Sequence, residues 1–169
     1  MAYTVNYTNV GNGYKKTLKT LALLPMLLPT ITYGFAIIYS FGKQGLFTRL
    51  LGRQAFDIYG ICGLLIGYVI YTLPISFMLI NNTMGYIDKK FMVVSRVMKD
   101  SAWGTFRETL LRPLAGTLAV SFIQCFFLCF TDFGIPASVG GGYEVIATLL
   151  YNQMLGGIPD FNRGAVIAW

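Results

Sequence analysis

The sequence lacks histidine and has few charged residues, and these two shortages exclude most catalytic functions. Of its 169 residues none is histidine, three are cysteine and 12% are charged, whereas 55% are hydrophobic. Acid–base catalysis and metal binding commonly use histidine, and no paired carboxylates or metal-ligand spacing replace it here. The even charge mix of a soluble domain is missing as well. We therefore expect a membrane protein that is not an enzyme and holds no cofactor or metal.

The cysteines allow one narrow alternative. Cys62, Cys125 and Cys129 all lie in apolar segments, and the last two, four residues apart, share a helix face. Two thiolates could contribute to a site for a soft metal, but no further cysteine or histidine stands nearby to complete it. We interpret the three as small packing residues.

Three uncharged apolar segments have the length of a membrane span, at residues 20–41, 58–80 and 114–130. A helix needs about 20 residues to cross a hydrocarbon core of roughly 30 Å. The predicted fold class is an all-α membrane protein, a polytopic helical bundle, with residues 1–19 as an N-terminal segment that does not resemble a signal peptide. A fourth apolar segment begins at Gly164 and stops at Trp169. We expect the chain to be a fragment whose last span is truncated.

The distribution of basic residues predicts the orientation. Three lysines precede the first span, and six basic residues lie between the second and third spans. Only three basic residues lie between the first and second spans, and one follows the third. By the positive-inside rule, the N-terminus and residues 81–113 face the cytoplasm of a bacterial cell, with the chain in the inner membrane. The net charge of +6 is then a topological signal and does not indicate nucleic-acid binding.

No ionisable residue lies within the three predicted spans; the nearest, Asp132, follows the third. Proton- and ion-coupled carriers place groups that change charge at membrane depth. A self-sufficient carrier of that kind is therefore not expected. Pro25, Pro29 and Pro74 stand inside spans, as static kinks or as hinges, and Gly60, Gly63 and Gly67 form a face suited to close helix packing.

Residues 89–107 have an amphipathic pattern. On one helix, Phe91, Val94, Met98, Ala102 and Phe106 fall on one side, and most of the charged residues fall on the other. Such a helix lies on the membrane surface or on the cytoplasmic ends of its own spans, or it docks a cytoplasmic protein. The pattern alone leaves both interpretations open.

The segment "FMVVSRVMKDSAWGTFRETLLRP" resembles the EAA loop of permease subunits of type I ATP-binding-cassette importers. The second half carries the resemblance, in Ser101, Trp103, Thr105, Phe106, Arg107 and Pro113. The first half departs from the family pattern, with Val93, Val94 and Ser95 in place of Glu-Ala-Ala and Lys99 in place of glycine. Asp100 or Ser101 could cap the helix that follows.

Two further stretches are similar to permeases of iron(III) and 2-aminoethylphosphonate importers: "FGKQGLFTRLLG", and the segment that runs from Thr131 to Ala168. The second contains Thr131-Asp132-Phe133-Gly134, three glycines at 140–142, and Phe161-Asn162. Taken alone, the glycines indicate a flexible loop and Phe161-Asn162 a helix start. The resemblance covers nearly all of residues 20–169 and identifies them as part of a permease transmembrane domain.

The resemblance implies a permease subunit that forms part of a solute pathway, with iron(III) or a phosphonate as the substrate. It implies four partners in addition to the lipid bilayer, and no nucleic acid: two cytoplasmic ATPase subunits, a second permease half and an extracytoplasmic solute-binding protein. The residues it assigns to ATPase coupling are Arg96, Lys99, Asp100, Ser101, Trp103, Phe106 and Arg107. Those it places at the pathway mouth are Asp132, Gly140, Gly141 and Gly142. The alternative is a non-transporting membrane scaffold that recruits a cytoplasmic partner through the same amphipathic segment.

Overall fold

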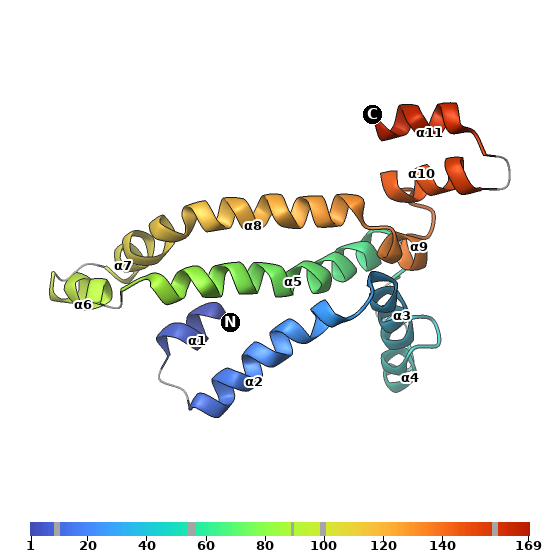
Figure 1. Ribbon diagram of the computed structural model, residues 1–169. Coiled ribbons are helices and arrows are strands. Elements are labelled where there is room, and N and C mark those ends of the chain that lie inside the picture. Colours follow the sequence, from blue (N-terminus) through green and yellow to red (C-terminus); the bar gives the residue numbers. More distant parts are fainter. Residues whose placement is uncertain (9–10, 54–56, 89, 99–100, 157–158) are drawn as a thin grey trace. The chain divides into compact units, whose positions relative to one another are not determined.

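The computed structural model describes residues 1–8, 11–53, 57–88, 90–98, 101–156 and 159–169, and within these ranges every regular element is helical (Figure 1). The all-α class is thereby confirmed. The helices are α1 (Ala2–Tyr7), α2 (Asn12–Leu23), α3 (Thr30–Phe41), α4 (Leu46–Leu51), α5 (Ile61–Tyr86), α6 (Lys90–Val97), α7 (Ala102–Phe106), α8 (Arg112–Thr131), α9 (Gly134–Val139), α10 (Ile146–Leu155) and α11 (Phe161–Ala168), with a 3-10 turn at Leu24–Leu27 and a π-helical turn at Arg107–Leu111.

The chain divides into two compact units, and both long helices contribute to each of them. The first unit comprises Met1–Met26 and Leu73–Phe126. In it α5 and α8 run antiparallel and are joined by two side-chain hydrogen bonds, Thr83 to Thr117 at 2.8 Å and Ser76 to Cys125 at 3.0 Å. Because few polar groups are available at this depth, such pairs fix which faces of two apolar helices meet.

The short helix α1 closes one side of this first unit. Asn6 Nδ2 donates to Asn81 Oδ1 at 2.9 Å, and the Tyr7 hydroxyl donates to the Met84 carbonyl at 3.4 Å. Ala2 and Tyr7 also pack against a buried cluster of Met84, Leu110 and Leu114. Burial raises the pKa of the Tyr7 phenol, with a further contribution from the neighbouring Tyr3. The N-terminal helix is therefore held to the ends of α5 and α8 by both polar and apolar contacts.

The second unit comprises Leu27–Thr72 and Phe127–Trp169, with α9 at its centre. Its core contains six buried residues, Tyr33, Ile37, Ile58, Leu64, Ile135 and Val139. Small residues let α9 approach its neighbours closely: a Cβ at Gly34 of α3 would overlap Ser138, and one at Gly67 of α5 would lie 2.6 Å from Ile135 Cγ2. A Cβ at Gly63 would meet Val139 at 3.1 Å. The packing role predicted for the glycine face is thus confirmed for Gly63 and Gly67.

The first predicted span is not a single helix. Residues 20–41 are interrupted at Leu28 and Pro29, between the 3-10 turn and α3. Proline has no N–H to donate and disfavours a helical conformation in the residue before it, so the helix ends there and restarts at Thr30. The break lies at Pro29, one of the prolines that were predicted to kink or bend a span. Pro29 itself is the N-cap residue of α3, with φ −59° and ψ 147°.

Two helices among the described residues are long and apolar enough to cross a membrane, Ile61–Tyr86 and Trp103–Thr131. A third crossing is formed if Asn12–Leu27 and Thr30–Leu51 act as one broken span. The helix Ile61–Tyr86 begins three residues later and ends six residues later than the predicted span 58–80. These findings agree with a multi-pass protein of the inner membrane.

The amphipathic segment 89–107 is also divided, contrary to the prediction of one helix. It forms α6 and α7, and Met98 stands in a turn after α6. The Ser101 side chain caps α7 by accepting a hydrogen bond from the Gly104 N–H at 3.1 Å. Serine at an N-cap starts a new helix because it satisfies a backbone donor that has no partner within the helix. Of the two predicted caps, Ser101 is confirmed, and Asp100 lies outside the described residues.

Candidate functional site

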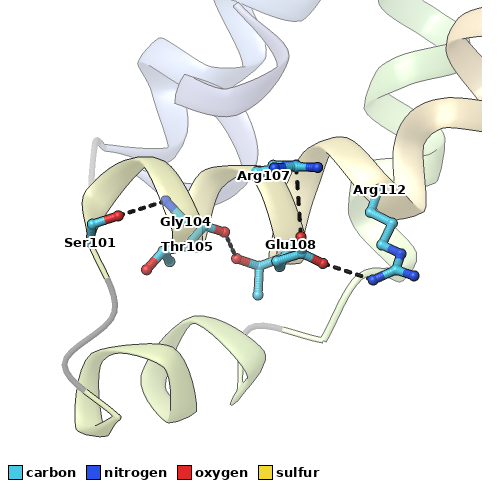
Figure 2. Close-up of polar contacts among 7 residues, drawn as sticks. Ser101, Gly104, Thr105, Arg107, Glu108 and Arg112 are labelled. Atoms are coloured by element: carbon cyan, nitrogen blue, oxygen red, sulfur yellow. Dashed lines mark hydrogen bonds and ion pairs between the residues drawn. The ribbon is translucent and has the colours of Figure 1, made fainter.

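Helices α6 and α7 fold against each other through polar groups. The Ser95 hydroxyl lies 2.8 Å from the Thr105 hydroxyl, and Ser95 is buried. Ser95 stands where the resembled family has the last residue of Glu-Ala-Ala, and it supplies the contact between the two helices. Figure 2 shows Ser101 bonded to the Gly104 N–H at the start of α7, with Thr105 in the same helix. The departure of the first half of the loop from the family pattern therefore does not prevent a folded helix pair.

The apolar side chains of this helix pair point mainly to solvent. Phe91, Val94 and Met98 are 62%, 53% and 72% exposed. Trp103 is 69% exposed, and its ring stacks on that of Phe106 with centroids 5.8 Å apart. Exposed apolar groups of this kind are typical of an interaction site. The exposure fits a helix pair that lies on the membrane surface as well as one that docks another protein, so docking stays a prediction.

The charged residues expected in the docking segment are only partly described. Lys99 and Asp100 lie outside the described residues, and Arg96 belongs to α6 without a described side chain. Arg107 opens the π-helical turn, where its Nε lies 3.8 Å from Glu108 Oε1. Glu108 also binds Arg112, with Nη1 and Oε2 2.9 Å apart (Figure 2). Glu108 and Arg112 were not among the predicted site residues, although their spacing of four residues is typical of helical ion pairs.

Asp132 is buried in the second unit. One of its carboxylate oxygens, Oδ2, accepts a hydrogen bond from the Ile135 N–H at 3.0 Å, at the start of α9. Tyr68 and Tyr71 of α5 lie close enough to interact electrostatically with this carboxylate. A buried carboxylate needs a hydrogen-bond donor, and the Ile135 N–H supplies one. Asp132 is thus a helix-capping group at the start of α9.

The glycine run 140–142 follows the other end of α9. Gly140 is buried and its N–H donates to the Pro136 carbonyl at 2.9 Å, which ends the helix. Gly141 has φ +61°, a conformation that glycine adopts without strain. Gly141 and Gly142 are exposed. The structure therefore brings Asp132 and the glycine run to opposite ends of one short helix, and Gly140 and Gly141 have defined roles in its termination.

The remaining sequence motifs have structural roles. Asp160 Oδ1 accepts hydrogen bonds from the N–H groups of Asn162 and Arg163, each at 3.1 Å, so Phe161-Asn162 is a capped helix start. None of the three cysteines, all of which are described, forms a disulfide. Among the described residues no three His, Cys, Asp or Glu side chains gather in a way that could hold a metal ion.

Comparison with known proteins extends over almost the whole chain. Residues 2–168 match the family described as binding-protein-dependent transport system inner membrane component. The chain is 25% identical to the ferric transport system permease protein of Actinobacillus pleuropneumoniae, over 99% of the chain and 25% of the relative. It is 28% identical to a thiamine transport system permease protein of Salmonella typhimurium, over 88% of the chain and 28% of the relative. With a molybdenum transport system permease protein of Azotobacter vinelandii it shares 27% identity, over 75% of the chain and 57% of the relative. The chain spans about a quarter of the length of the first two relatives.

Proposed function

The chain belongs to the family of binding-protein-dependent transport system inner membrane components, and from this premise we propose that it forms part of the solute pathway of an ATP-driven importer. The family predicted from the sequence is thereby confirmed, and its members are transport subunits, not catalytic enzymes. ATP hydrolysis is assigned to separate cytoplasmic subunits, and solute delivery to an extracytoplasmic binding protein. A second permease half completes the pathway.

The observation that carries the proposal is the exposed apolar surface of α6 and α7, which we name the docking surface and define as Phe91, Val94, Met98, Trp103 and Phe106. It follows the first long apolar helix and includes the start of the second, Trp103–Thr131, in the segment that resembles the coupling segment of the family. Large aromatic side chains that are exposed alone and buried in a complex contribute most to binding. The ATPase is therefore expected to cover Trp103, and its ATP-driven movements would reach the spans through α7 and α8.

The composition of the spans supports an external source of energy. Helix α5 carries no charged residue, and in α8 the only one is Arg112 at its first position. Neither helix offers a group that could change charge at membrane depth to couple a proton or ion gradient to transport. Transport through this chain consequently requires work done elsewhere, which is the role proposed for the ATPase.

The solute is proposed from the relatives alone. Their names specify ferric, thiamine and molybdenum transport. The ferric relative supports iron(III) as the first solute to test, ahead of the phosphonate that the sequence also suggested. Asp132 and the glycine run at 140–142 are proposed to stand at the outer mouth of the pathway.

The test replaces Trp103 by alanine in the full-length permease, expressed with its ATPase. Loss of the indole removes the largest exposed ring of the docking surface, so co-purification of the ATPase should fall by about tenfold or more. Membrane insertion should be unchanged. The double charge reversal Arg96→Glu with Lys99→Glu should weaken the same association.

The matched control is Tyr39→Ala, because Tyr39 of α3 has the same exposed fraction as Trp103, 69%, and lies outside the docking segment. It should leave ATPase co-purification intact. Normal ATPase binding and normal transport in both docking variants would show that residues 89–107 do not couple the chain to an ATPase. Such a result would favour the scaffold hypothesis if another cytoplasmic protein co-purified instead.

A further inference from the structure

Two arginines share one carboxylate at the start of α8. Arg112 pairs with Glu108 at 2.9 Å, and Arg107 approaches the other oxygen of the same carboxylate at 3.8 Å. Both guanidinium groups are largely exposed. One negative charge between two positive ones leaves a net positive charge, and each guanidinium keeps N–H groups that do not face Glu108. The cluster can therefore still bind an anion (Figure 2).

The π-helical turn brings these two arginines to one side. In an α-helix, residues five apart differ by about 140° around the axis. Here the Arg112 N–H bonds to the Arg107 carbonyl, so the wider turn carries the fifth residue back toward the first. A π-helical turn is rare and often marks a functional position. Here the π-helical turn places Arg107 and Arg112 together at the end of an apolar helix.

Leu111 contributes to the lining of two hollows within the first unit. The first, of about 390 Å³, is lined by Arg107, Glu108, Leu111, Arg112 and Ala115. The second, of about 220 Å³, is almost wholly apolar, and its lining includes Ile80, Met84, Leu111, Leu114 and Leu118. A basic hollow and an apolar groove are thus neighbours that share one lining residue.

We propose that these two neighbouring hollows together bind one anionic phospholipid, with its phosphate on Arg107 and Arg112 and an acyl chain along the groove of Leu111, Leu114 and Leu118. Guanidinium groups match phosphate oxygens in bidentate geometry. Basic pockets beside membrane helices hold anionic headgroups in this way. The groove is lined by residues of α5 and α8, which are long and apolar enough to lie in the bilayer, and also by Ala2, Tyr3 and Phe106. A lipid matches both the charge and the apolar length.

The site can be tested by lipid binding to the full-length importer in nanodiscs of phosphatidylcholine, into which phosphatidylglycerol is titrated. Retained lipid is then measured by native mass spectrometry. The wild-type protein should retain phosphatidylglycerol in preference to phosphatidylcholine. Arg112→Gln should lower that preference by about fivefold, the contribution typical of one basic residue near an anionic lipid surface.

The matched control is Arg163→Gln. Arg163 is also an exposed arginine paired with a carboxylate, Asp160, at 3.5 Å, but it lines neither hollow. It should leave lipid retention unchanged. Leu118→Trp, which fills the groove, should lower retention of both lipids and leave the basic pair intact.

Three results would overturn the proposal. The first is a wild-type protein that shows no preference for phosphatidylglycerol. The second is equal lipid retention by Arg112→Gln and Arg163→Gln. The third is a cross-link from Leu118 that captures a helix of the second permease half in the groove. The wild-type titration stays decisive even if the Arg112 variant fails to fold. The substituted residues, Arg112 and Leu118, lie outside the docking surface, so failure of this test is distinguishable from failure of the proposed function.

Discussion

At the scale of single residues, Asp132 shows how one side chain combines a structural and a proposed functional role. Its carboxylate caps α9 through the Ile135 N–H, and it is buried near two tyrosines of α5. An interface residue that only marked the end of a span would be exposed to water. Asp132 is buried instead, but its place at the pathway mouth stays a prediction. Substitutions can distinguish the contribution of its charge from that of its hydrogen bond.

Asparagine and alanine at position 132 separate the two roles. Asp132→Asn keeps an oxygen that can accept the Ile135 N–H but removes the charge, so α9 should persist. Substrate uptake should fall, while expression and ATPase association stay normal. Asp132→Ala also removes the cap, which should cost about 1 kcal/mol and lower the thermal stability as well.

The control for this pair is Asp160→Asn, since Asp160 caps α11 by the same kind of bond and its side chain is more exposed. Uptake and thermal stability should both remain near the wild-type values. Normal uptake in Asp132→Asn would restrict Asp132 to helix capping.

At the scale of helices, hydropathy located the apolar segments but not their ends. The number of apolar residues predicts that a segment crosses the membrane; it does not show where the backbone breaks. Pro29 ends one helix inside the span 20–41, and Ser101 starts a new one inside the segment 89–107. Both signals are local and were read from the sequence, as a proline inside the span and as a capping residue, whereas the apolar pattern alone continued across each break.

Contacts between distant residues could not be predicted in the same way. Ser101 acts on a backbone group three residues away, so its cap was predicted. The tyrosines near Asp132 belong to α5, which is far from Asp132 in the sequence. Thr83 and Thr117 are likewise far apart in the sequence. A single sequence gives helix faces but not the partner that each face meets. The polar pairs between α5 and α8 were therefore found only in the folded chain.

A double-mutant cycle on Thr83 and Thr117 tests whether their hydrogen bond stabilises the helix pair. Thr83→Val and Thr117→Val should each destabilise the protein when it is unfolded reversibly in detergent. The double variant should reveal a coupling free energy of about 0.6 kcal/mol between the two positions. Thr131→Val is the control, because the Thr131 hydroxyl bonds to Phe127 of its own helix. Additive effects of the two valines would mean that the hydroxyls do not stabilise the contact.

At the scale of the whole molecule, the number of crossings decides which side of the membrane each segment faces. The broken pair Asn12–Leu27 and Thr30–Leu51 either crosses as one span or enters and leaves on the same side. Crossing places the N-terminus with residues 81–113, as the basic residues predict. Re-entry would place the N-terminus on the opposite side from that loop.

Single cysteines at three glycines distinguish these topologies in a full-length permease whose native cysteines have been replaced. A Cβ added at Gly13, Gly85 or Gly142 would have no atom within 4 Å, so a cysteine fits all three positions without repacking. A maleimide that cannot cross the membrane should label Gly142→Cys in intact cells. It should label Gly13→Cys and Gly85→Cys only after permeabilisation, because both precede or follow spans on the basic, cytoplasmic side. Labelling of Gly13→Cys from outside, with Gly85→Cys still protected, would mean that the broken pair is re-entrant and that α5 makes the first full crossing.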